Sequence, residues 1–109
     1  MGRYILLVQS NPTDGNEAEF NKWYDEIHLG EVLEVQGFKA AQRFKVEGEP
    51  ATGAPAHDYL AIYEIEAEQG QDALDALNKA IGGGMNLSAA IDLANVSAVL
   101  YSPLGERMS

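Results

Sequence analysis

Hydrophobic and polar residues repeat with regular periods over six segments of the chain. Apolar residues recur at helical spacing over residues 16–28, and again from residue 69 to the three consecutive glycines at 82–84. The alternation typical of strands covers residues 3–10, 38–46 and 59–66, and a shorter apolar run covers 96–102. The predicted order of elements is therefore strand, helix, strand, strand, helix, strand.

The ends of the first helix are marked by turn residues. Asn11 to Gly15 form a turn cluster before it, and we expect the helix to bend at Gly30, continue as a short turn over residues 31–35 and end at Gly37. A long segment rich in proline and glycine, residues 47–58, separates the second and third strands.

This element order predicts one α+β domain over residues 1–109 with a ferredoxin-like βαββαβ fold. Both helices would cover one face of a four-stranded antiparallel sheet and leave the other face bare. Residues 3–9 and 96–101 are apolar on both faces of their strands. We therefore expect a second copy of the chain to cover the bare face in a two-fold homodimer.

The second and third strands are expected to pair as a hairpin. Matching their faces sets Gln42 beside Tyr63 and Phe44 beside Ala61. The same register turns Arg43 to the opposite face, where it could bind a substrate carboxylate or pair with Glu64 and Glu66 across the hairpin or across a dimer.

Composition narrows the classes of partner. Seventeen acidic residues against seven basic ones give a formal charge of −10, which repels nucleic acid and anionic membranes. The chain has no cysteine, so neither a disulfide framework nor a thiolate nucleophile is present. The first ten residues are too short an apolar run for a signal-peptide core or a membrane span, and we expect a cytoplasmic protein.

His28 is the main candidate for chemistry. It follows Tyr24 by one turn, at the border of the apolar stripe that Phe20, Trp23 and Tyr24 form. The helix would therefore bring His28 to the entrance of any cavity that the helix covers. A metal site built with His57 stays open as an alternative, but no helical His pair or tight ligand cluster supports it, and no metal is predicted.

The same residues carry a family resemblance. Within this strand order, the chain resembles the dimeric α+β barrel superfamily and is most similar to small EthD-like proteins through Phe20, Trp23-Tyr24, His28, Gly37-Phe38 and Arg43-Phe44. It departs from the pattern at Gly30 and at Gln36, two positions where proline is common in such sequences. Both departures loosen the break after the helix without touching His28.

The resemblance implies a pocket between helices and sheet for a small hydrophobic or aromatic molecule. The superfamily includes lactone isomerases, polyketide cyclases, cofactor-free monooxygenases, decarboxylases and dehydratases, and only His28 matches the position expected to do chemistry. The residue pattern adds Tyr24 as a second catalytic candidate, because a phenol can donate a hydrogen bond to a developing oxyanion. The expected substrate-binding residues are Trp23, Gln42, Phe44, Tyr59 and Tyr63.

Two functions follow from this reading. The first is a cofactor-independent lyase, isomerase or cyclase of catabolism or secondary metabolism, with His28 as general base or acid. The second is a non-catalytic protein that binds a hydrophobic small molecule or accompanies an oxygenase. Substrate identity, reaction type, the role of His57 and assembly beyond a dimer are open at this point.

Overall fold

The computed structural model of the protein describes all of residues 1–109 and has the predicted order of elements. The first half holds β1 (Gly2–Ser10), α1 (Glu17–Trp23), the π-helical turn η1 (Tyr24–His28), α2 (Leu29–Leu33) and β2 (Phe38–Lys45). The second half holds β3 (Tyr59–Ala67), α3 (Gly70–Gly82), the short 3₁₀ turn η2 (Leu93–Asn95) and β4 (Ser97–Tyr101).

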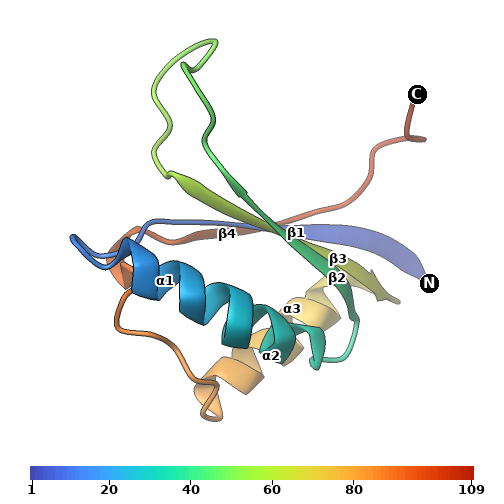
Figure 1. Ribbon diagram of the computed structural model, residues 1–109. Helices are drawn as coiled ribbons and strands as arrows, with labels where there is room; N and C mark the ends of the chain where they lie inside the picture. The colour runs from blue at the N-terminus through green and yellow to red at the C-terminus, as the bar shows by residue number, and fades with distance from the viewer.

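The four strands form one antiparallel sheet in the order β2-β3-β1-β4. The helices α1, α2 and α3 lie together on one face of this sheet, whereas the long connection between β2 and β3 extends away from it (Figure 1). This arrangement is the expected α+β, ferredoxin-like fold. It places every side chain of the candidate site either in the helix–sheet layer or on the open face of the sheet.

The core occupies the layer between helices and sheet because the inward residues of both are apolar. The inward positions Tyr59, Ala61, Tyr63 and Ile65 of β3 are buried, and they meet buried side chains of the first helical segment and of α3. Burial of each large side chain stabilises the fold by about 1.5–3 kcal/mol. The core side chains that matter below are Phe20, Trp23, Tyr24, Tyr59 and Tyr63.

The predicted hairpin register is wrong by one residue. Phe38 lies opposite Ile65, but the next paired residue of β2 is Ala40, opposite Glu64, so Lys39 forms a β-bulge. An extra residue in one strand reverses the facing of every side chain that follows it. Gln42 therefore pairs with Ile62 and Phe44 with Leu60, on the open face. The helix-facing positions go to Ala41, Arg43 and Lys45 instead.

The first helical segment is irregular at a different place from the one predicted. Gly30 lies inside α2 with helical backbone on both sides, and the segment does not break there. The irregular turn is η1, one turn earlier, where residues 24–28 have π-helical geometry. Single π-turns of this kind occur inside α-helices, frequently at functional sites.

The open face of the sheet carries large apolar side chains in contact with solvent. They are Ile5, Phe44, Val99 and Tyr101. Because β1 pairs Ile5 with Tyr101 and Leu7 with Val99, the exposed residues of β1 and β4 lie side by side. None of the helices combines the length and the apolar character that a membrane span requires.

Candidate functional site

The π-helical turn determines which ring His28 contacts. In a regular α-helix, the residue one turn before His28 is Tyr24, whereas the wider π-turn brings residue 23 beneath residue 28. The indole of Trp23 and the imidazole of His28 are accordingly stacked, with ring centroids 4.5 Å apart and planes inclined by 21°. Tyr24 meets the same imidazole edge-on at 5.2 Å. The turn thus holds the imidazole of His28 against the rings of Trp23 and Tyr24.

His28 is buried and uncharged at neutral pH. The residue is 8% exposed, and its Nδ1 has no hydrogen-bond partner. Burial disfavours the imidazolium form and lowers the pKa of His28 from 6.5 to about 4. At pH 7 the ring is a neutral group with one nitrogen available to a hydrogen-bonding partner.

The phenols of Tyr24 and Tyr63 lie next to each other in the same layer. Burial raises the pKa of both phenols, and the hydroxyls of Tyr63 and Ser10 oppose that effect at Tyr24. Tyr63 is 1% exposed, and its hydroxyl lies near that of Tyr24 without the geometry of a hydrogen bond, so it is left without a partner. Both phenols are neutral donors at pH 7, and Tyr24 separates two buried polar atoms, Nδ1 of His28 and Oη of Tyr63, that are unsatisfied.

Arg43 closes the outer side of this cluster. Its guanidinium carbon lies 4.4 Å from the ring centroid of Tyr24 and 5.4 Å from those of Phe20 and Tyr59. Its Nη1 donates a hydrogen bond to Oδ1 of Asp25 at 2.8 Å. The expected pairing of Arg43 with the glutamates of β3 is therefore wrong, because the bulge at Lys39 turns Arg43 towards the helices.

Tyr59 takes part in a polar chain along the outer edge of α1. Its hydroxyl donates a hydrogen bond to Glu17 and accepts one from Nδ2 of Asn21 at 3.3 Å. The bond from Tyr59, followed by the charge of Lys45, lowers the pKa of Glu17. These contacts bind α1 to the sheet edge that Arg43 also occupies.

The structure brings together five of the seven predicted site residues. Trp23, Tyr24, His28, Tyr59 and Tyr63 are all buried in the helix–sheet layer. Gln42 and Phe44 lie on the open face, where Phe44 is 43% exposed, so they do not line this layer with the other five. Asn21 was not predicted, and Arg43 was considered for a substrate carboxylate but was placed on the opposite face of its strand. Strand alternation could not reveal Arg43, since a bulge leaves no signal in a regular period.

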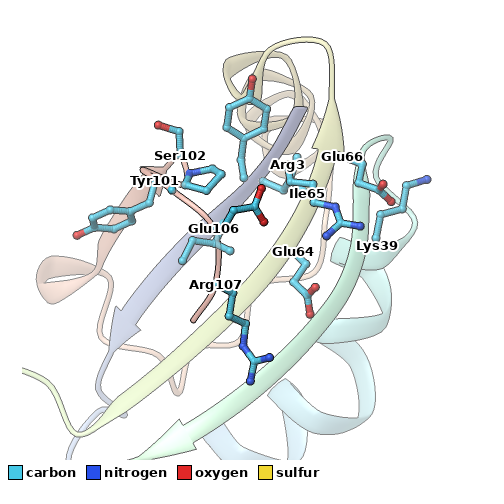
Figure 2. A pocket seen from close by; sticks show the side chains of 13 residues that line it. Arg3, Lys39, Glu64, Ile65, Glu66, Tyr101, Ser102, Glu106 and Arg107 are labelled. Atoms are coloured by element: carbon cyan, nitrogen blue, oxygen red, sulfur yellow. The ribbon is translucent and has the colours of Figure 1, made fainter. Parts of the chain in front are cut away.

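Two hollows in the surface lie away from the His28 cluster. One, of about 620 Å³, is on the open face, where Figure 2 shows charged side chains of both signs from the sheet and from the C-terminal segment. It is lined by Arg3, Lys39, Glu64, Glu66, Glu106 and Arg107 among others. The second, of about 520 Å³, lies between α2 and α3. Neither hollow includes a predicted site residue.

His57 contacts a different part of the chain from His28. Its Nε2 lies 2.6 Å from the carbonyl oxygen of Asn95, which attaches the β2–β3 connection to η2. No group of three or more His, Cys, Asp or Glu side chains is placed to hold a metal ion.

Comparison with known proteins supports the fold through structure alone. No protein-family model matches the sequence, and no curated protein matches it. An ethyl tert-butyl ether D (EthD) family protein from Bacillus halodurans C-125 shares the fold at a TM-score of 0.61 and 16% identity, covering 99% of this chain and 100% of that one. A protein of Shewanella loihica PV-4, described provisionally as a monooxygenase, shares it at a TM-score of 0.58 and 18% identity, covering 96% and 97%. The chain therefore has the fold of EthD-like proteins.

Proposed function

We propose that the protein is a cofactor-independent enzyme, a lyase, isomerase or cyclase, that acts on a small hydrophobic and largely aromatic molecule. The observation that carries this proposal is the pair of buried, unpartnered polar atoms beside Tyr24, Nδ1 of His28 and Oη of Tyr63. Leaving such an atom unsatisfied costs about 1–3 kcal/mol, and native proteins rarely retain one without a role. A ligand bound beside Tyr24, with one polar group at each of these atoms, would satisfy both.

The charge states favour a particular kind of chemistry. With a pKa of about 4, His28 is a weak base and is not an acid at pH 7, but as a neutral ring it can donate or accept a hydrogen bond according to its tautomer. The phenols of Tyr24 and Tyr63 are neutral donors. Neutral donors in an apolar site stabilise negative charge that develops on a carbonyl or phenol oxygen. That suits isomerisation or cyclisation through an enolate, in which Nδ1 of His28 takes the α-proton of the substrate, the phenols donate hydrogen bonds to the enolate oxygen, and the imidazolium then returns the proton to carbon.

We also propose that the protein is a homodimer formed through the open face of the sheet. The exposed Ile5, Val99 and Tyr101 on the neighbouring strands β1 and β4, together with Phe44 on β2, support this, because large exposed apolar patches are typical of interfaces between proteins. A two-fold axis through the face would bring the same residues of both copies together.

A second candidate is a non-catalytic protein that binds a hydrophobic molecule or accompanies an oxygenase. One observation favours it: burial lowers the pKa of His28 to about 4, so the ring is a poor proton acceptor at pH 7. Such a ring can hold a ligand by a hydrogen bond without promoting proton transfer.

Exchange of ketone α-protons with solvent separates the two functions. The probe is 2-tetralone, an uncharged aromatic ketone with acidic α-protons, followed by NMR in deuterated buffer with and without protein. The enzyme proposal requires faster exchange with the wild type than with His28→Gln or Tyr63→Phe. Each substitution should weaken tetralone binding by about threefold to tenfold, the equivalent of one hydrogen bond.

The matched control is His57→Gln, which removes the other imidazole at a distance from the cluster. It should behave as the wild type does. Binding that depends on His28 and Tyr63 without any exchange would favour the non-catalytic protein. If both variants bind and exchange the ketone as the wild type does, the site is not where we propose it.

A further inference from the structure

Arg43 differs from every other basic residue of the protein. It is the only one of the seven that is not exposed, and its side chain is 12% accessible to solvent. The molecule as a whole carries a charge of −10, which repels anions. A cation held in a partly buried position attracts anions locally, although the molecule as a whole repels them.

The guanidinium is fixed by rings rather than by its counter-ion. It lies over Tyr24 and borders Phe20 and Tyr59, and aromatic faces attract a cation in this geometry. Its Nη2 also donates a hydrogen bond to Oδ1 of Asn21 at 2.8 Å. A guanidinium has five donors in a rigid fork, and the structure uses two of them in side-chain hydrogen bonds.

Asp25 is the weak member of the ion pair. Its side chain is 61% exposed, against 12% for Arg43. An ion pair with one partner in solvent contributes little to stability, so another carboxylate can replace Asp25 at small cost. The Asp25 carboxylate, 2.8 Å from Nη1, already shows that a carboxylate can bind at this edge of the guanidinium.

Arg43 also acts directly on the candidate site. One aromatic ring, that of Tyr24, separates the guanidinium from His28, because both contact that ring. Burial raises the pKa values of Tyr24 and Tyr63, and the charge of Arg43 opposes the effect at both phenols. The site therefore combines neutral hydrogen-bonding groups at one end with a fixed cation at the other.

We propose that Arg43 is a ligand-binding residue that makes the site selective for aromatic carboxylates, which it binds in place of Asp25. The proposal rests on the function proposed above, since it assumes that the ligand occupies the cluster around Tyr24. It adds the chemical class of the ligand: a planar aromatic ring that carries a carboxylate at one end.

Two probes of the same shape test the proposal. Isothermal titration calorimetry compares 2-naphthoate with the uncharged 2-naphthamide. The wild type should bind naphthoate about tenfold more tightly than the amide, the value of a charge-assisted hydrogen bond. The preference for naphthoate should fall as the salt concentration is raised from about 0.05 M to about 0.5 M, because screening weakens a partly exposed ion pair.

Three variants assign that preference to Arg43. Arg43→Gln should bind both probes equally while its affinity for the amide changes by less than about threefold, which shows that the fold of the site is intact. Arg43→Lys should keep part of the preference, because it keeps the charge without the fork. Asp25→Asn should tighten naphthoate binding roughly twofold to fivefold by removing the competing carboxylate.

Failure of this inference can be told apart from failure of the proposed function. Equal affinities of the wild type for the two probes, or a preference that survives in Arg43→Gln, overturns the role of Arg43. So does a wild type that binds neither probe, even if it binds 2-tetralone through His28. The tetralone experiment tests the proposed function independently of Arg43, because 2-tetralone carries no charge.

Discussion

At the scale of single residues, His28 shows how packing changes the chemistry of a side chain. An exposed histidine exchanges protons near pH 6.5 and can serve as a base at pH 7. Contact with Trp23 and Tyr24 removes water from this ring, and burial lowers its pKa to about 4. The residue type suggests proton transfer, whereas its surroundings favour hydrogen bonding by a neutral ring.

Protonation of His28 should reduce the stability of the fold. Because the folded-state pKa of about 4 lies below the unfolded-state value of 6.5, the unfolded chain binds more protons between these two values. The free energy of unfolding should therefore decrease as the pH falls from about 6.5 to 4, by on the order of 3 kcal/mol at most. Urea denaturation at each pH, compared with His28→Gln, isolates this contribution.

Trp23 offers a direct readout of the same event. It is the only tryptophan in the chain, and it is stacked on His28. A charged imidazole quenches indole fluorescence more strongly than a neutral one, so emission should fall near pH 4 in the wild type and not in His28→Gln. A midpoint near 6.5 would contradict the burial argument, and His57→Gln should leave the curve unchanged.

At the scale of elements, one extra residue in each of two places determines the site. The bulge at Lys39 exchanges the faces of β2, and the π-turn η1 exchanges Tyr24 for Trp23 as the ring beneath His28. Each irregularity locally weakens the hydrogen-bond pattern of its element.

The glycines that flank these irregularities should respond to alanine in opposite ways. Gly30 has helical backbone and open space where a Cβ would lie, so Gly30→Ala should raise the free energy of unfolding by about 0.5–1 kcal/mol. Gly37 has a φ of +98°, and a Cβ there would lie 3.1 Å from that of Ala73. Gly37→Ala should lower the free energy of unfolding by about 1–3 kcal/mol.

Urea denaturation of both glycine variants measures the difference. A destabilised Gly30→Ala would mean that the first helical segment bends at Gly30 in solution, as the sequence alone predicts. Binding of 2-tetralone should be unchanged in Gly30→Ala, because the residue is exposed and outside the aromatic cluster.

At the scale of the whole molecule, the two faces of the sheet differ in what covers them. The helices cover one face, and exposed apolar residues of β1, β2 and β4 leave the other suited to a second copy. Two copies that each carry −10 repel one another. Dimerisation should therefore depend on salt, because screening reduces the repulsion while burial of apolar surface does not change.

A charge on the open face tests the proposed dimer. Val99→Glu places a carboxylate among the apolar residues of β4, and it should weaken self-association about tenfold or more. Leu33→Glu is the matched control, since Leu33 is similarly exposed but belongs to α2 on the helical side. Sedimentation equilibrium measures both. A wild type that is monomeric at about 0.5 M salt and 100 μM protein would remove the dimer from the proposal.

The sequence by itself determined the order of elements, the helix-facing stripe of the first helix and the antiparallel α+β sheet. These features follow from local periods of apolar residues, which are written along the chain. These periods therefore suffice to place Trp23, Tyr24, His28, Tyr59 and Tyr63 in the layer between helix and sheet.

Only the tertiary structure decided which side of β2 faces that layer and which ring lies against His28. A bulge or a π-turn adds one residue where long-range packing favours it, and no period in the sequence marks the position. For that reason Gln42 and Phe44 were placed on the wrong face, and Arg43 could not be placed beside Tyr24. The pKa of His28 likewise depends on burial, which is a property of the assembled layers and not of the residue.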